Sequence, residues 1–391
     1  SQRVDRSESQ VCIKGRYEDR VLQNCYDFIR MSCMFIFGGF MNAAVHEKTG
    51  LERFVLTIIG IMPWAIVGTL LYAGLFVKPT VIINEVVPAS INVRDRVYGL
   101  AHQGDQNWLA AGNYGLMLSS ADNGVSWKVQ DSTTMVHFQD ISAWKDEPNR
   151  AVAVGNDGVI VVTEDGGENW TTVDSPKSDI ANKLLKVHTY AGGEAITVGE
   201  MGAVLRSKDY GKTWARLKAE CGCELDDIFM NDVVKTPDGT YYVAAEFGRI
   251  FITRDDGVVW EEIQSDSPNS FGAIDAKNND EITIVGLAGV TVSTKDAGET
   301  WTYIAPQQSG MTEHMMDVQW SDAIDRWVAI GNKGKWMTFT SDLTDFEPMN
   351  ISATDYTSHS EMVIVGDKGL AVGATVGSLD LKTREWTLLH D

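Results

Sequence analysis

The sequence predicts an all-β fold, a seven-bladed β-propeller, preceded by one N-terminal transmembrane helix. Tryptophans recur at positions 127, 170, 214, 260 and 301, in steps of 43, 44, 46 and 41 residues. A Gly-x-x-Gly-like turn precedes each of them, and its last residue always lies 12 positions before the tryptophan. The third observation is an uncharged stretch at 54–77, which is long enough to predict the membrane helix.

The uncharged stretch "FVLTIIGIMPWAIVGTLLYAGLFV" exceeds the ~20 residues that a helix needs to cross a bilayer. Its length and its distance from the first residue argue against a signal peptide. Eight Lys and Arg residues precede it, whereas Lys78 is the only one between it and Arg94. By the positive-inside rule we expect a single-pass protein of a bacterial inner membrane, with a cytoplasmic N-terminus and a periplasmic propeller.

Three domains follow from this topology: a cytoplasmic segment at 1–50, the anchor at 51–79 and the propeller at 80–391. Within the first, the apolar run 31–45 is too short to span, so it predicts an interfacial helix, with a re-entrant hairpin as the alternative. The anchor carries small residues that would let another membrane helix approach closely, although glycine is also generally common in such helices. These are Gly60, Ala65, Gly68 and Gly74.

Short runs rich in β-branched residues, such as "RAVAVG", "VIVVTE" and "IFITRD", separate the turns. About four such strands per ~40-residue unit are typical of a propeller blade. Two degenerate copies follow the five regular ones: Gly334 leads to Phe346 after 12 residues, and a final unit ends at Trp386. Seven units therefore fill the chain, and the lack of a sustained 3.6-residue period excludes a helical solenoid.

Each regular unit contains the pattern [Ser/Thr]-x-Asp-x-Gly-x-x-Trp. A carboxylate two residues before a glycine suits a hairpin in which Asp accepts backbone N–H groups and Gly adopts positive φ. The tryptophan offers a large apolar face to a neighbouring blade. We therefore interpret the pattern as structural. Its residues are Asp122, Gly124, Trp127, Asp165, Gly167, Trp170, Asp209, Gly211, Trp214, Asp255, Gly257, Trp260, Asp296, Gly298 and Trp301.

This pattern resembles the Asp-box, or BNR repeat, which is known from sialidases and from many non-enzymatic propellers. The resemblance implies a place at the outer edge of the blades, away from the central site. The Arg-Ile-Pro motif of sialidases is absent, and Arg206 and Arg254 lie beside the boxes instead of at the starts of blades. We expect no catalytic residue, no cofactor and no metal, and keep a glycosidase built on another carboxylate pair as an alternative.

Over residues 80–391 the sequence is similar to the photosystem II stability/assembly factor-like propellers, on the repeated pattern seen in "AVGNDGVIVVTEDGGENW". The resemblance implies a non-enzymatic chaperone that docks on a membrane complex through a basic patch. This chain departs from that pattern, with 25 basic against 47 acidic residues from position 78 onward. Related membrane-anchored proteins of non-photosynthetic bacteria are associated with resistance-nodulation-division (RND) type exporters.

The leading hypothesis is a non-catalytic accessory or scaffold subunit of a membrane transport complex, with an RND-type exporter as polytopic partner and lipid contact through the anchor. A net charge of −21 argues against a nucleic-acid partner. One alternative is an assembly chaperone of a photosynthetic membrane complex. Another is a membrane-anchored glycan-binding protein or glycoside hydrolase.

Two further clusters have both a functional and a structural interpretation. Cys221 and Cys223, in "ECGCE", would form a strained and labile disulfide in an oxidising compartment, and two free thiols are the alternative. Met311, His314, Met315 and Met316, in "SGMTEHMMD", have the ligand types of a copper site. A methionine-rich loop that enters a strand explains the second cluster equally well.

Overall fold

The computed structural model describes residues 49–76, 91, 92, 94–217 and 228–390. The chain divides into two compact units, Ser1–Val86 and Val87–Asp391. The predicted interfacial helix at 31–45 and the pair Cys221 and Cys223 lie outside the described residues.

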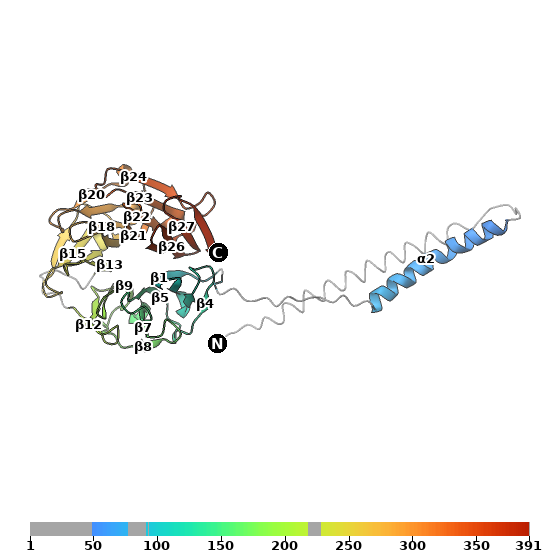
Figure 1. Cartoon of the computed structure of the whole chain (residues 1–391), viewed down its shortest axis with the longest axis horizontal. Helices are drawn as coiled ribbons and strands as arrows, with labels where there is room; N and C mark the ends of the chain where they lie inside the picture. The colour runs from blue at the N-terminus through green and yellow to red at the C-terminus, as the bar shows by residue number, and fades with distance from the viewer. Residues whose placement is uncertain (1–48, 77–90, 93, 218–227, 391) are drawn as a thin grey trace. The chain divides into compact units, whose positions relative to one another are not determined.

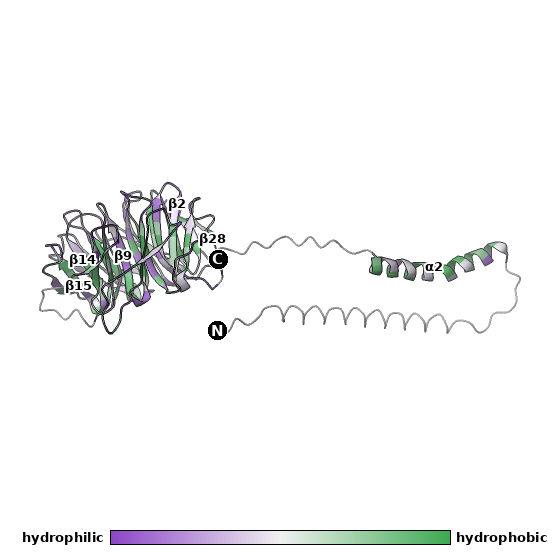
Figure 2. Cartoon of the chain, turned by 90° about the horizontal axis from the view of Figure 1, so that it is seen from below, coloured by the Kyte–Doolittle hydropathy of each residue, from purple (hydrophilic) through white to green (hydrophobic). Residues whose placement is uncertain are grey.

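The helix of the first unit, α2, spans Gly50–Phe76 and is largely apolar on its surface (Figure 2). Its 27 residues extend about 40 Å at ~1.5 Å per residue, more than the ~30 Å hydrocarbon core of a bilayer. The Glu52 carboxylate accepts the N–H of Thr49 at 3.0 Å, which closes the first turn. In the part of the chain that the structure describes, α2 is the one helix long and apolar enough to span a membrane.

The second unit is a ring of seven four-stranded antiparallel sheets (Figure 1), which confirms the predicted seven-bladed propeller. Each sheet consists of four consecutive strands that pair in chain order. The blades are β1 Val97–Gly104, β2 Asn107–Gly112, β3 Met117–Ser120, β4 Lys128–Val129; β5 Phe138–Ala143, β6 Ala151–Gly155, β7 Ile160–Thr163, β8 Thr171–Val173; β9 Leu184–Tyr190, β10 Glu194–Gly199, β11 Val204–Ser207, β12 Ala215–Arg216; β13 Met230–Lys235, β14 Tyr241–Ala245, β15 Arg249–Thr253, β16 Glu261–Gln264; β17 Phe271–Ala276, β18 Ile282–Gly286, β19 Thr291–Thr294, β20 Thr302–Ile304; β21 Met315–Ser321, β22 Arg326–Gly331, β23 Lys335–Phe339, β24 Phe346–Asn350; and β25 His359–Val365, β26 Lys368–Gly373, β27 Val376–Asp380, β28 Trp386–His390.

The Gly-x-x-Gly-like turns join the second and third strands of the blades. In the first blade Tyr114 and Gly115 have φ of 53° and 73°, the left-handed pair that a type I′ hairpin turn requires. The first glycine of the motif permits a close backbone approach, since a Cβ on Gly155 would lie 2.1 Å from the carbonyl oxygen of His137. These turns include the short helices η1 Asn113–Gly115, η2 Asn156–Gly158, η3 Glu246–Gly248, η4 Leu287–Gly289 and η5 Asn332–Gly334, while a short helix α3, Pro306–Ser309, joins β20 to β21.

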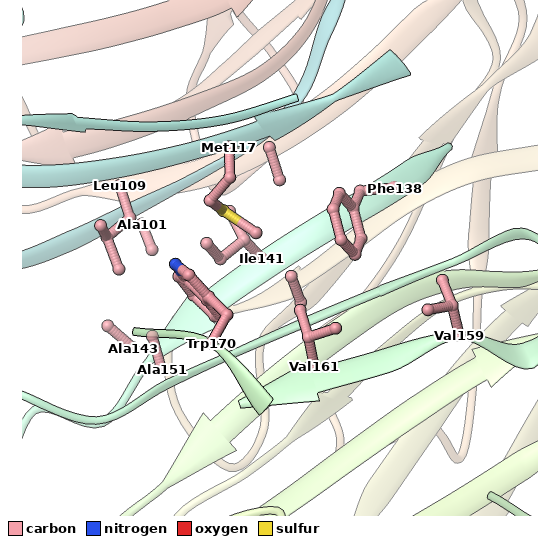
Figure 3. Close-up of a cluster of buried hydrophobic side chains, with 12 residues drawn as sticks. Ala101, Leu109, Met117, Phe138, Ile141, Ala143, Ala151, Val159, Val161 and Trp170 are labelled. Atoms are coloured by element: carbon pink, nitrogen blue, oxygen red, sulfur yellow. The ribbon is translucent and has the colours of Figure 1, made fainter. Parts of the chain in front are cut away.

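The core is divided into seven apolar clusters, one between each pair of neighbouring blades. Figure 3 shows the cluster between the first two blades, where Leu109 and Met117 face Ile141, Val161 and Trp170. The first and seventh blades close the ring in the same way, through buried apolar residues of both sheets. Because no strand is exchanged between these blades, the closure depends on side-chain packing.

Candidate binding site at the mouth of the central channel

The innermost strand of each blade lines the central channel: β1, β5, β9, β13, β17, β21 and β25. Figure 1 shows β9 and β13 near the centre of the ring and β8, β12 and β24 at its periphery. In an antiparallel meander, the first strand starts at the same end of the sheet as the turn between the second and third strands. The innermost strands therefore all begin at one face of the ring, beside the Gly-x-x-Gly-like turns, and we name it the funnel face.

A cavity of about 440 Å³ opens where the innermost strands begin, and residues of all seven blades line it. Tyr98, Gln139, Leu185, Asn231, Gly272, Met316 and Ser360 are the second residues of the seven innermost strands, and all lie in its wall. A second cavity of about 480 Å³ shares Tyr98, Met316 and Ser360 with the first. The two form one groove that leads from the channel mouth over the sixth and seventh blades.

Large apolar side chains are exposed on the funnel face around this groove. Three aromatic side chains are largely exposed: Tyr356 by 70%, Tyr114 by 64% and Phe247 by 60%. Their turns and loops also carry Met135, Ile180 and Leu287, and Met316 is exposed at the start of β21. Of these residues, Leu287, Met316 and Tyr356 line the groove itself. Exposed apolar side chains that gather in a groove are typical of sites of protein contact, so the funnel face has the character of a binding surface.

Carboxylates in the channel wall tie neighbouring blades together. Asp140 on β5 accepts the N–H of Ile141 at 2.8 Å and the N–H of Val187, on the next blade, at 2.8 Å. Equivalent bonds join Asp232 to Val233 (2.7 Å) and Ile274 (3.0 Å), and Asp317 to Val318 (2.9 Å) and Met362 (2.8 Å). Each carboxylate thus satisfies two buried donors and fixes the spacing between two blades.

One lysine spans the channel below its mouth. Lys186 of the third blade places its Nζ 3.2 Å from Oε2 of Glu361, in the seventh blade, and 3.9 Å from Oδ1 of Asp140. These side chains are at most 13% exposed. His188, on the same strand as Lys186, contacts Asp232 with its Nε2 at 2.8 Å.

We name this part of the channel, with Asp140, Lys186, His188, Asp232, Asp275, Asp317 and Glu361, the channel floor. Among the described residues it holds more carboxyl groups than cationic side chains. Burial raises the pKa of Asp275 to about 7 and that of Asp317 to about 6. Burial and the neighbouring Asp140 raise the pKa of Glu361. Burial opposes the charge of Lys186, but the surrounding carboxylates, with Asp140 foremost, raise its pKa well above the ordinary value. Because these pKa values are raised, part of the carboxyl groups hold protons near pH 7, and the negative charge of the floor is smaller than their number.

The Asp-boxes lie at the opposite face, in the turns between the third and fourth strands. In the third blade Asp209 accepts the N–H of Thr213 at 2.9 Å and the hydroxyls of Ser207 and Thr213 at 2.8 and 2.6 Å. The N–H of Gly211, whose φ is 77°, donates to the Ser207 hydroxyl at 2.9 Å. The other four boxes repeat this pattern around Asp122, Asp165, Asp255 and Asp296.

The box tryptophans pack on the preceding blade. Trp170 lies in the cluster shared with the first blade, and Trp127 in the cluster that closes the ring onto the seventh blade. Trp214 donates its indole N–H to the carbonyl of Gly211 at 2.9 Å. The boxes therefore stabilise the packing between neighbouring blades. They lie at the face of the ring opposite the channel mouth.

Replacing Asp209 with alanine should lower the free energy of unfolding by about 1–2 kcal/mol, because a half-buried turn loses an acceptor of three hydrogen bonds. Urea unfolding of the full-length chain in detergent, followed by tryptophan fluorescence, measures this change. Glu168→Ala, an exposed carboxylate in the neighbouring box, is the matched control and should stay within about 0.5 kcal/mol. Equal effects of the two substitutions would contradict the structural role of the box aspartate.

The small residues of α2 are on a helix with no buried residue in the structure. A Cβ at Gly60, Gly68 or Gly74 would meet nothing within 4 Å, and the Ala65 carbonyl accepts the hydroxyl of Thr69 at 2.7 Å. The close approach of a second membrane helix at these positions stays a prediction.

The structure places the members of the methionine and histidine cluster in different surroundings. Met311 and Met315 are buried in the core, and Nδ1 of His314 accepts the N–H of Ala288 at 2.8 Å. No group of three or more His, Cys, Asp or Glu side chains suited to a metal occurs among the described residues. Packing in the core accounts for Met311 and Met315, whereas Met316 is exposed and lines the groove.

A tyrosine and a glutamate do meet away from the channel mouth, as they would in a sialidase. The Tyr241 hydroxyl donates to Oε1 of Glu194, and Lys235 pairs with the same carboxylate. Tyr241 has no exposed surface, and burial raises its pKa above the ordinary value. A phenol without exposed surface is out of reach of a substrate, so this cluster is a packing feature between the third and fourth blades.

Comparisons with known proteins agree with these features. The family described as "Photosynthesis system II assembly factor YCF48" matches residues 132–222. YCF48 bound to a D1 peptide shares 15% identity and a TM-score of 0.58, covering 73% of this chain and 92% of its own; YCF48 from Cyanidioschyzon merolae has the same identity and score, covering 73% and 94%. These matches confirm the predicted resemblance to the photosystem II assembly factor-like, Asp-box propellers.

Other propellers share the architecture of this assembly factor-like chain without sharing much sequence. The WD40 propeller domain of Doa1 is 10% identical with a TM-score of 0.58, over 75% of this chain and 96% of its own. An ancestral GH74 enzyme is 11% identical with the same score, over 75% of this chain and 46% of its own. No curated protein matches the sequence. At these identities the structural likeness establishes the fold alone.

The channel carboxylates of the assembly factor-like propeller were absent from the sequence prediction. Their signal is a recurring pair, Asp-Ile or Asp-Val, two residues after the start of an innermost strand: "FQDI", "MNDV" and "MMDV". The pattern occurs in only three of the seven units, and Lys186 and Glu361 replace the aspartate in two others. A search for polar residues at one fixed position of every unit would have found it.

Proposed function

We propose that this membrane-anchored propeller is a non-catalytic assembly factor that holds an exposed segment of a polytopic membrane protein on its funnel face. The observation that carries the proposal is the apolar groove at the channel mouth, lined by all seven blades. One similar propeller, YCF48, has been solved with a D1 peptide bound. Its peptide binding supports the same type of ligand here.

The attachment of the chain supports the funnel face as the partner side. Asn113, in the turn η1, accepts the N–H of Arg96 at 2.9 Å and donates to the carbonyl of Arg94 at 3.1 Å, so the segment before β1 arrives at this face.

The expected exporter partnership has less support than the assembly role. The family match and the two YCF48 structures favour assembly, and none of the comparisons points to an RND-type exporter. We therefore propose the assembly role first and treat the exporter as an identity that the partner experiment would reveal. The proposal also includes the membrane topology, with the propeller in the periplasm and the N-terminus in the cytoplasm.

The test is to purify tagged full-length chain from gently solubilised native membranes and to identify the bound proteins by mass spectrometry. An assembly factor should retain incompletely assembled forms of one membrane complex, whereas a subunit would retain the mature complex. Phe247→Asn keeps a residue that tolerates the left-handed backbone, with φ of 59°, and removes an exposed apolar side chain. We expect this variant to recover several-fold less partner.

Two further samples make the result decisive. Val258→Asn, an exposed apolar residue of an Asp-box turn on the opposite face, is the matched control and should retain the partner. Gly60→Leu with Gly68→Leu tests whether the anchor contributes to the contact. Recovery of the chain alone, or equal recovery with Phe247→Asn, would overturn the funnel face as the binding site.

A further inference from the structure

The walls and the floor of the groove differ in chemistry. Towards the fifth to seventh blades the wall is apolar, with Leu287, Met316 and Tyr356 exposed. Below the mouth, five carboxyl groups face two basic side chains, Lys186 and His188. The five are Asp140, Asp232, Asp275, Asp317 and Glu361.

The rim is divided in the same way. The Gly-x-x-Gly-like turns of the second, third and fourth blades carry Asp157, Glu200 and Glu246, and Glu246 also lines the cavity. The corresponding turn of the fifth blade has Leu287 and Ala288 instead. The turn of the sixth blade carries Lys333, which pairs with Glu313 at 3.1 Å, and Arg96 lines the second cavity. The acidic part of the rim therefore lies on the second to fourth blades, and the groove wall towards the fifth to seventh blades is more apolar.

The single lysine of the floor does not balance this acidity. Its ammonium group lies between Glu361 and Asp140, whereas Asp317 and Asp275 are bound by backbone N–H groups. A buried carboxyl group without a cationic partner is costly in its charged form. A second cation at the mouth would lower the pKa of these carboxyl groups and so stabilise their ionised forms.

We infer that the funnel selects an extended polypeptide segment in which one basic side chain points into the channel mouth while its apolar neighbours lie against the fifth to seventh blades. The basis is charge complementarity between a cationic side chain and the acidic rim and floor, combined with the apolar groove. The inference rests on the proposed function, since it names the chemistry of the segment that the funnel face holds. A segment with an acidic side chain at that position would be repelled by Glu246 and by the ionised carboxylates of the floor.

The test uses three synthetic nonapeptides of one apolar sequence, acetylated and amidated, with arginine, citrulline or glutamate at the central position. Their binding to the full-length chain in detergent micelles is measured by fluorescence anisotropy. Citrulline has the shape of arginine without its charge, so the ratio of the two dissociation constants isolates the cation. We expect the arginine peptide to bind at least about tenfold more tightly than the citrulline peptide, and the glutamate peptide to bind most weakly.

Two variants locate the effect. Glu246→Gln keeps the oxygen that accepts the N–H of Phe229 and should reduce the arginine-to-citrulline ratio about threefold. Glu299→Gln, an exposed carboxylate of an Asp-box turn on the opposite face, is the control and should leave the ratio unchanged. Phe247→Asn should weaken all three peptides alike, because it removes apolar contact without changing charge.

The outcomes separate this inference from the proposed function. Equal binding of the arginine and citrulline peptides, weakened alike by Phe247→Asn, would overturn the cation selectivity and leave the peptide-binding function intact. If Glu246→Gln leaves the arginine-to-citrulline ratio unaltered, the cation binds outside the funnel, and the inferred cation selectivity of the funnel is overturned as well. Failure of all three peptides to bind would count against the proposed function and the inference together.

Discussion

Replacing Asp140 with alanine is expected to lower the free energy of unfolding of the propeller by about 3–5 kcal/mol. The side chain is buried and accepts two backbone N–H groups, those of Ile141 and of Val187 on the next blade. Both donors would be left unsatisfied in the channel wall. Lys186 would also lose one of its two carboxylate neighbours.

Urea unfolding of the full-length chain in detergent, followed by tryptophan fluorescence, measures this loss. Asp140→Asn keeps one acceptor oxygen and should cost about half as much as the alanine substitution. Asp179→Ala, an exposed loop carboxylate, should change stability by less than about 0.5 kcal/mol. A cost below about 1 kcal/mol for Asp140→Ala would show that the carboxylates do not hold the blades together.

Replacing Lys186 with methionine is expected to cost about 3–5 kcal/mol at pH 7.5, and clearly less at pH 5. Methionine retains most of the apolar stem but removes the charge that faces Glu361 and Asp140. At pH 7.5 these carboxylates, with Asp232 and Asp317 nearby, are left without their ammonium partner. At pH 5 protonation relieves much of that repulsion.

The sign of this pH dependence follows from the raised carboxyl pKa values. Asp317 has a pKa of about 6 and Asp275 of about 7, against about 4 for an unfolded aspartate. The folded chain therefore holds protons that the unfolded chain has released, so the associated stability is full below about pH 4 and is lost as pH rises through 6 and 7. Asp232 raises the pKa of His188 against the effect of burial, so the contribution of His188 to stability is also lost as pH rises.

We therefore expect even the unaltered chain to lose stability between about pH 4 and pH 7.5, with a steeper loss in Lys186→Met. Thermal unfolding midpoints across this range measure both slopes. Hydrogen bonds from Ser126 and Thr300 lower the pKa values of the box residues Asp122 and Asp296, so their titration lies below this window. Lys177→Met, on an exposed loop, is the control and should follow the unaltered chain; parallel curves for all three proteins would rule out the channel floor as the cause.

The sequence by itself determined the seven-bladed propeller and the apolar helix, because both depend on local patterns. Gly124 and Gly211 occupy turns that need positive φ, and the aspartates before them bond donors within four residues. Because these contacts are local, every copy of the sequence pattern forms the same turn. The spacing of the five tryptophans therefore predicted one blade for each copy. The length and composition of 54–77 similarly required no knowledge of the rest of the chain.

Only the tertiary structure decided where the binding surface and the charged floor lie. Lys186 and Glu361 are separated by 175 residues and belong to blades that are not neighbours, so ring closure alone brings them together. In the sequence, a polar residue on a half-buried strand is equally consistent with a solvent-facing position. The closed ring converts that position into a channel wall, where low solvent access makes each charge depend on partners from distant blades.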